Sequence, residues 1–343
     1  MNNNKKEKIM NKYTKLGVSA LCGSLAAVSA ANAGDLSVSG GVDMSWISLP
    51  KADTGNPIGS GSNYTLSGSG ELDNGWNVAL SIVATNKMVY STTNVTVTVP
   101  SLGDLIITQG GTGKGIDRMD DVTPNVWEEA YGTGLTNGIQ TVNGATTGAG
   151  IEWTPNMTPD GLTARVFYSP GVGGAAASEK AGAGAIIDTS AAGWDVTLVA
   201  DDSVTGMAGL TIGGGYSEQE RTQASGDSSD TTIYATYAMG GFTFGYQWSE
   251  ADLGTTTGAQ QYDNDGYGIT FAVNDDLSIG YNHYESEQTN TANVTNEASS
   301  VQIAYSMGGA SVRLAQSEGE NMLYSTAAAG DRDSTVLSVS LAF

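Results

Sequence analysis

Apolar and polar residues alternate along much of this chain, in short segments separated by turn-forming residues. In 241–250, aromatic residues occupy every second position, and small or polar residues occupy the positions between them. The same alternation recurs in 262–273 and in 297–307, and none of these apolar faces carries a charge. Since successive side chains of a strand point to opposite faces, this period predicts β-strands with one apolar and one polar face.

Clusters of Gly, Asp, Asn and Ser divide the chain into sixteen candidate strands. They span 35–48, 62–73, 76–89, 94–99, 104–110, 147–155, 160–169, 193–201, 207–219, 230–239, 241–250, 262–273, 276–287, 297–307, 309–317 and 333–343. The connections alternate between short and long, except that 90–93 is short where the pattern requires a long one. A further candidate strand near 182–190 would put long loops on both sides, so we assign it to a loop.

Short turns on one side and long loops on the other are typical of a transmembrane antiparallel up-and-down β-barrel. An even number of strands also places both chain ends on the side of the short turns. We therefore expect an all-β fold of about 16 strands that forms one domain, 34–343. A soluble β-sandwich or a secreted β-solenoid would show a similar alternation and is the alternative.

The two ends of the chain indicate where the protein resides. The final segment, 333–343, has an unbroken apolar face that ends on Phe343, as in the closing strand of bacterial outer-membrane barrels. The beginning has a lysine-rich stretch, an apolar run over about 16–30 and then Ala31-Asn32-Ala33, which is the pattern of a secretory signal peptide. We expect residues 1–33 to be removed and the mature protein to reach the cell outer membrane. An N-terminal membrane anchor is the alternative.

Composition excludes several other classes of protein. The formal net charge is −22 at pH 7, which argues against a nucleic-acid partner, because such binding needs Lys and Arg. Beyond the predicted signal peptide, no apolar run is long enough for a transmembrane helix. The single cysteine, Cys22, lies within the signal peptide, so we expect a mature chain that is held together without disulfides.

Few residues could support catalysis or bind a cofactor. His283 is the single histidine, and it lies near the outer end of a predicted strand, so neither a catalytic triad nor a zinc site is expected. The segment around Lys114 lacks the first Gly and the Ser or Thr of a phosphate-binding loop. Asp263-Asn264-Asp265-Gly266 resembles the start of a calcium loop but lacks the distal Glu. We expect no enzyme and no cofactor. The acidic external loops could hold Ca²⁺ weakly through oxygen ligands.

At the level of the whole mature chain, the sequence resembles the general (non-specific) porins of Gram-negative bacteria. The matching features are the signal peptide, the opening Asp35–Gly41, the turn Asp73–Trp76, the strand pair around Pro100–Thr108, a long third loop and the terminal Phe343. The resemblance implies a sixteen-stranded homotrimer in the lipid bilayer of the outer membrane. It also implies that the third loop, 111–146, folds into the lumen and narrows the pore.

The resemblance assigns the pore constriction to charged residues of the third loop and the opposite wall. The loop carries five acids and two bases, namely Asp117, Asp120, Asp121, Glu128, Glu129, Lys114 and Arg118. Arg165 and Arg313 alternate with apolar neighbours, so both are expected to point into the lumen. The dense arginine cluster of many porins is absent. Because carboxylate rings favour cations, we expect a modest cation preference. The alternative is that these acids only solvate the loop or pair with its own bases.

The expected function is passive diffusion of small hydrophilic solutes and ions through a water-filled channel. We expect no N-terminal domain large enough to plug the barrel, of the kind that active barrel transporters need. Two alternatives stay open. A substrate-selective porin would differ only in contacts at the constriction, and a secreted or surface β-rich adhesin or structural protein would form no channel.

Overall fold

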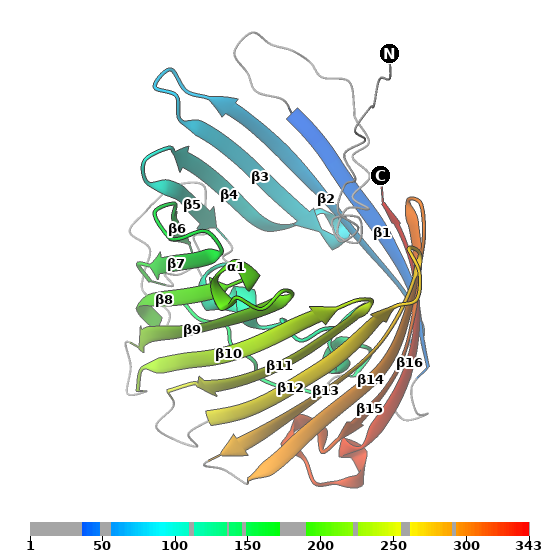
Figure 1. Ribbon diagram of the computed structural model, residues 1–343. Helices are drawn as coiled ribbons and strands as arrows, with labels where there is room; N and C mark the ends of the chain where they lie inside the picture. Colours follow the sequence, from blue (N-terminus) through cyan, green and yellow to red (C-terminus); the bar gives the residue numbers. More distant parts are fainter. Residues whose placement is uncertain are drawn as a thin grey trace.

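The computed structural model describes residues 36–48, 56–109, 113–135, 137–145, 149–171, 190–221, 226–254, 261–289 and 293–342. Sixteen antiparallel strands form one closed barrel, which confirms the predicted fold class (Figure 1). The strands are β1 (Leu36–Ser48), β2 (Ile58–Glu71), β3 (Asn77–Thr85), β4 (Val89–Val99), β5 (Gly103–Gln109), β6 (Gly150–Pro155), β7 (Leu162–Ser169), β8 (Ser190–Ala200), β9 (Leu210–Arg221), β10 (Ser228–Met239), β11 (Phe242–Asp252), β12 (Gln261–Ala272), β13 (Leu277–Thr289), β14 (Val294–Met307), β15 (Ala310–Glu320) and β16 (Arg332–Ala342).

The helices are short and lie between strands. They are α1 (Asp202–Thr205) and the 3₁₀ helices η2 (Asn86–Met88), η3 (Gly115–Met119), η4 (Ala130–Gly132), η5 (Met322–Tyr324) and η6 (Ala328–Gly330). None of the helices within the described ranges is long and apolar enough to cross a membrane. The proposed signal peptide, residues 182–189 of the candidate strand near 182–190, and Phe343 lie outside the described residues.

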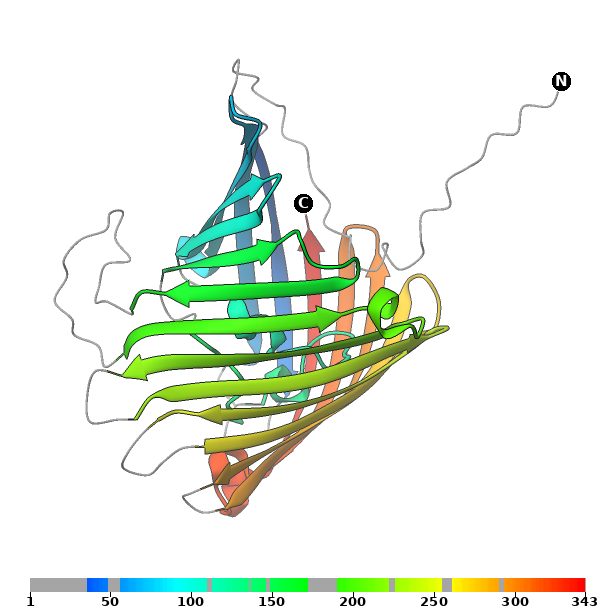
Figure 2. The ribbon, with the colours of Figure 1, turned by 60° about the vertical axis from the view of Figure 1, so that its left-hand side comes forward.

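The barrel closes where its first and last strands meet. β1 pairs with β16 in antiparallel register, from Gly41 opposite Ala342 to Ser48 opposite Thr335. Every other strand pairs with its neighbours in the sequence, as Figure 2 shows for the strands on the near wall. Closure removes both edges of the sheet, and in lipid each unpaired backbone group would cost several kcal/mol. The predicted closing strand is therefore confirmed as β16 over the described residues Arg332–Ala342.

The two faces of the sheet have opposite character. On β14, Val301 and Ile303 are exposed on the outer side of the barrel, whereas Gln302 between them is fully buried. On β11, Phe244 and Tyr246 are exposed while Gln247 is buried. This arrangement is the reverse of a soluble protein, because the solvent of the outer face is hydrocarbon.

The short and long connections lie as expected, with one difference in position. Tight turns such as Leu72–Trp76 use a glycine with positive φ, here Gly75 at +80°. The irregular short connection is η2, at 86–88, and β4 already begins at Val89. The predicted connection at 90–93 was therefore placed too late. The strand pair β3–β4 also shifts register between Val83 and Ala84, which is an irregularity that alternation alone does not show.

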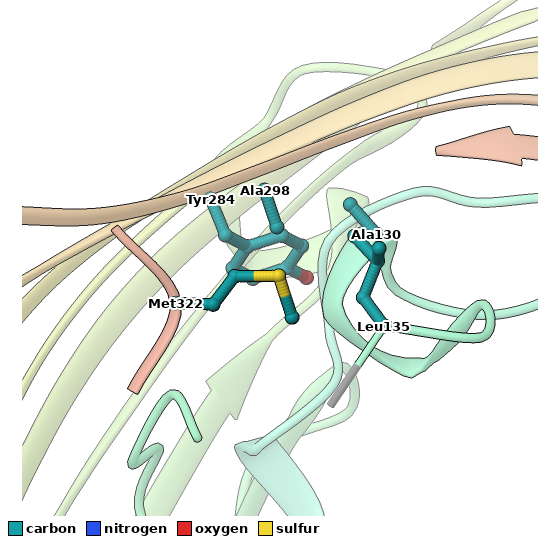
Figure 3. Close-up of a cluster of buried hydrophobic side chains, with 5 residues drawn as sticks. All are labelled: Ala130, Leu135, Tyr284, Ala298 and Met322. Atoms are coloured by element: carbon teal, nitrogen blue, oxygen red, sulfur yellow. The ribbon is translucent and has the colours of Figure 1, made fainter. Parts of the chain in front are cut away.

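The long connection between β5 and β6 contains η3 and η4 and packs against the polar face of the sheet. Figure 3 shows a small apolar cluster in which this loop meets β13, β14 and η5. The cluster consists of Ala130, Leu135, Tyr284, Ala298 and Met322. The ring of Tyr131 meets that of Tyr284 edge to face, with 4.8 Å between their centroids. This cluster gives the loop an apolar anchor on an otherwise polar surface.

Candidate channel constriction

The third loop follows the polar face of the wall across many strands. The first helical turn, η3, contacts β7, β8, β9 and β10, and η4 contacts β13, β14 and β15. Thr133 then reaches the closing strand, where Ser334 Oγ donates a hydrogen bond to its carbonyl at 2.7 Å. A loop that is held over such a distance cannot be a free external loop.

Buried carboxylates of the wall hold the backbone of the loop. Glu152 Oε2 on β6 accepts a hydrogen bond from the N–H of Gly115 at 2.7 Å. Asp195 on β8 accepts from Ile116 N at 3.1 Å through one oxygen and from Ala145 N at 3.0 Å through the other. Both carboxylates are inaccessible to solvent. Hydrogen bonds to a charged acceptor are the stronger kind, so Asp195 ties the beginning of the loop to its end.

Asp230 on β10 continues this set of carboxylates. Its Oδ2 accepts from the N–H groups of Asn143 and Gly144, at 3.1 and 2.6 Å. The sequence analysis did not single out these wall acids. The alternation of the sequence could have revealed them. Asp195 stands between the outward-facing Trp194 and Val196, so it belongs to the polar face.

Carboxamides of the wall bind the middle and the return of the loop. Gln302 Oε1 on β14 accepts from Trp127 N at 3.1 Å, and its Nε2 donates to the carbonyl of Glu128 at 2.5 Å. Asn264 Nδ2 on β12 donates to the carbonyl of Gln140 at 2.9 Å. An amide can both donate and accept, so these side chains satisfy loop groups that have no strand partner.

Glycines of β11 and β12 allow the loop to approach the wall closely. A Cβ atom on Gly268 would lie 2.2 Å from the carbonyl oxygen of Pro124. A Cβ atom on Gly245 would lie 2.3 Å from Cδ of the same proline. Any larger residue at either position would push the loop away from the wall.

The predicted acids of the loop form close groups in which burial disfavours charge. Burial, together with the charges of the neighbouring Asp121 and Asp117, raises the pKa of Asp120 to about 8. The pKa of Asp117 is also raised by burial, although this carboxylate accepts a hydrogen bond from the backbone N–H of Gly113. Asp120 is therefore largely protonated at neutral pH.

Glu128 and Glu129 form a second group. Glu129 is buried. Burial raises the pKa of Glu129 to about 9, together with a side-chain hydrogen bond to Glu128 and the negative charge of Glu128. Asn125 Nδ2 donates to Glu129 Oε1 at 2.6 Å. Like charges at such proximity favour a shared proton over two carboxylates.

The predicted bases of the loop lie together near β6. Arg118 binds Glu152 through Nη2–Oε1 at 2.5 Å and Nε–Oε2 at 3.1 Å, which makes the contact bidentate. Lys114 is buried, and burial followed by the charge of Arg118 lowers its pKa. Arg165 on β7 interacts electrostatically with Arg118 and Glu152. Arg118 thus pairs with Glu152 of the wall, and Lys114 interacts more strongly with Glu152 than with Asp117 of its own loop.

Arg313 is separated from this group. It lies on the polar face of β15 and donates to Ser311 Oγ and to Ser340 Oγ, the latter at 2.7 Å. The structure therefore brings Arg165 to the charged loop residues and places Arg313 in a different environment, at the seam of the barrel.

The single histidine lies on the outer face. His283 Nε2 is 3.0 Å from Glu285 Oε1, and its ring lies 4.9 Å from that of Tyr267. Ligand atoms of His283, Glu285 and Glu297 lie within 4.8 Å of one another. The segment Asp263–Gly266 belongs to strand β12, so it does not form the calcium loop that its sequence resembles.

Comparison with known proteins agrees with this architecture. The chain matches the family model for the Gram-negative porins over residues 17–312. No protein with a curated description matches it. It is similar to a loop L8 deletion mutant of OmpT, an outer membrane protein of Vibrio cholerae, with a TM-score of 0.66 and 14% identity over 90% of this chain and 99% of that one.

Two further solved structures share the fold. A porin structure refined at 1.8 Å has a TM-score of 0.66 and 13% identity, over 90% of this chain and 100% of that one. The anion-selective porin from Comamonas acidovorans has a TM-score of 0.64 and 11% identity, with the same coverage. The family consists of channels without catalytic activity, and neither an enzyme nor a secreted adhesin fits it. The chain belongs to the Gram-negative porin family.

Proposed function

We propose that this outer-membrane porin passes small hydrophilic solutes and ions by passive diffusion, through a water-filled lumen that its third loop narrows. The observation that carries the proposal is the attachment of that loop to the polar face from β6 to β16. Asp195 holds both ends of the loop, Gln302 holds its middle, and Thr133 reaches the closing strand. A loop fixed at so many points defines a constriction of constant size, which is what size exclusion requires.

The charge of the constriction favours a modest preference for cations. Lys114 is buried and Arg118 is paired with Glu152, which reduces the positive charge that the two bases present to the lumen. The loop also carries five acids, of which Asp120 and Glu129 hold their protons near neutral pH. The remaining carboxylates give an excess of negative charge that is small at pH 7 and grows as the pH rises.

The proposal also includes assembly of the chain into a trimer and removal of its signal peptide. A related fold, the in vitro folded OmpT of Vibrio cholerae, is described as a trimer form. We expect this chain to form a homotrimer as well, and to do so after a signal peptide of residues 1–33 has been removed. The anion-selective neighbour shows that the fold by itself does not fix the sign of selectivity.

Single-channel recording of the refolded mature protein in a planar bilayer tests these points together. Conductance steps in groups of three, with a reversal potential of cationic sign under a KCl gradient, are the expected result. A reversal potential of anionic sign would keep the channel and refute the charge argument. Absence of current from folded, membrane-inserted protein would refute the diffusion channel itself.

A substrate-selective porin is the second candidate, and one feature of the wall favours it. Opposite charges line a recess that the third loop does not cover, at the seam between β1 and β16. Such a recess can bind a solute in a way that a uniformly charged wall cannot.

A further inference from the structure

The recess lies in the wall at the seam between β1 and β16, where the barrel closes. Its volume is about 550 Å³, and its lining comes from β1, β2, β15 and β16 together with Thr85 and Asn86. Gly41 and Gly61 contribute no side chain to this part of the wall, and a Cβ atom on Gly61 would lie 3.4 Å from Asn86 Oδ1. Larger residues at these positions would fill the space, so the hollow follows from the glycines.

One hydroxyl separates the two charged groups of the recess. Ser340 Oγ lies 2.7 Å from Arg313 Nη2, from which it accepts, and 2.7 Å from Asp43 Oδ2, to which it donates. Ser338 Oγ donates to the same Asp43 oxygen, also at 2.7 Å. Ser311 Oγ accepts from Arg313 Nε and Nη2. Five hydrogen bonds with three serines therefore fix both charged groups in place.

Both charged groups retain unused hydrogen-bonding capacity. Within the described ranges, the hydrogen bonds of Arg313 use Nε and Nη2, and those of Asp43 use Oδ2. This leaves Arg313 Nη1 as a donor and Asp43 Oδ1 as an acceptor. Among the described residues, Arg313 and Asp43 make no direct ion pair, so neither neutralises the charge of the other completely.

A guanidinium and a carboxylate at this separation match a solute whose ammonium and carboxylate groups are attached to the same carbon atom. The carboxylate of such a solute would bind the planar fork of Arg313, and its ammonium group would bind Asp43. A simple cation or anion would be attracted by one residue and repelled by the other. The amide of Asn63 lines the same recess and offers donors and an acceptor to the rest of the solute.

We propose that this recess is a low-affinity binding site for small zwitterions, the chemical class of the free α-amino acids. The proposal rests on the diffusion channel proposed above, because Asp43 and Arg313 lie on the polar face of the wall, which would line the lumen. It assigns Asp43, which sequence analysis did not single out, and Arg313 to solute recognition. Arg313 is thereby removed from the constriction to which the family resemblance assigned it.

The experiment records KCl current through the full-length mature channel in a planar bilayer at pH 7 while glutamine is added. Glutamine is zwitterionic at this pH and leaves the ionic strength unchanged. Glutaramide, which is neutral and of nearly the same size, is the control solute. The variants are Arg313→Gln and Asp43→Asn, and Glu71→Gln is the matched control, since Glu71 is exposed at the end of β2 outside the recess.

The expected result is a saturable reduction of current by glutamine that glutaramide does not reproduce. Each recess variant is expected to weaken the apparent affinity at least about tenfold, as loss of one hydrogen bond to a charged group implies. Glu71→Gln is expected to bind glutamine with the affinity of the unaltered protein. Arg313→Lys is expected to have an affinity between those of the unaltered protein and Arg313→Gln.

Two results would overturn the proposal while the channel stands. One is a normal KCl current with no saturable effect of glutamine. The other is a glutamine effect whose apparent affinity in both recess variants equals that of the unaltered protein. Absence of KCl current in the unaltered protein would instead refute the proposed channel, so the two failures can be told apart. Far-UV circular dichroism and heat-modified migration confirm that each variant is a folded barrel.

Discussion

Asp195→Ala is expected to loosen the third loop without opening the barrel. The carboxylate is the shared acceptor for Ile116 N and Ala145 N, and it is inaccessible to solvent. Its removal leaves two buried N–H groups without their acceptor, at about 1–3 kcal/mol each. Relief of the cost of burying the carboxylate offsets part of this loss. A net destabilisation of the closed loop by about 2–4 kcal/mol follows.

This energy can be measured through local opening of the loop. Because 1.4 kcal/mol corresponds to a factor of ten, the open population should rise by about 30-fold or more. Trypsin cleaves after Lys and Arg, and both Lys114 and Arg118 lie next to the Asp195 contact. Cleavage at these two residues in the detergent-solubilised barrel should therefore accelerate, and open-channel current noise should increase.

A wall acid that does not touch the loop provides the control. Asp104 accepts from Thr98 Oγ1 within the β4–β5 pair, so Asp104→Asn should leave the cleavage rate unchanged. Asp195→Asn retains one acceptor oxygen and should give an intermediate rate. If Asp195→Ala were cleaved no faster than the unaltered protein, the attachment of the loop by wall carboxylates would be refuted.

The remaining predictions concern charge, pH and packing. Arg118→Gln leaves Glu152 without its cationic partner and should shift the reversal potential toward stronger cation preference; an unchanged potential would count against this pair. Cation preference should rise as the pH increases through about 8 and about 9, since Asp120 and Glu129 then lose protons, and Glu129→Gln should remove the upper part of that rise. Gly268→Val should displace Pro124 and change single-channel conductance. Gly240→Ala, at a turn where a Cβ atom would meet nothing within 4 Å, should lower stability because φ is +63° there, but it should leave the conductance unchanged.

Local alternation was sufficient to predict the strands and their faces. Whether a residue such as Gln302 or Asp195 faces inward depends only on its position in a period of two, and the neighbouring residues reveal that period. The number of strands followed in the same way from turn signals such as Gly75. The bounds were less accurate at η2, because a positive φ at Lys87 ends β3 where the sequence still alternates.

The path of the third loop could not be predicted in this way. Its contacts join residues far apart in the sequence, as in the hydrogen bond from Ser334 to the carbonyl of Thr133. Which wall side chain meets which loop atom depends on the position of the loop, and that depends on the apolar cluster around Tyr284 and on the space left by Gly245 and Gly268. The sequence shows which loop residues are charged, but it does not show which wall residues they contact.

The sequence by itself determined that this chain forms a closed membrane barrel, because the period of side chains along a strand and the positions of turns are local properties. The tertiary structure alone decided which charges meet. Arg118 pairs with Glu152 instead of loop acids, and Arg313 meets Asp43 through Ser340 at the seam. Such pairings depend on strand register and barrel closure, which bring together residues from opposite ends of the chain.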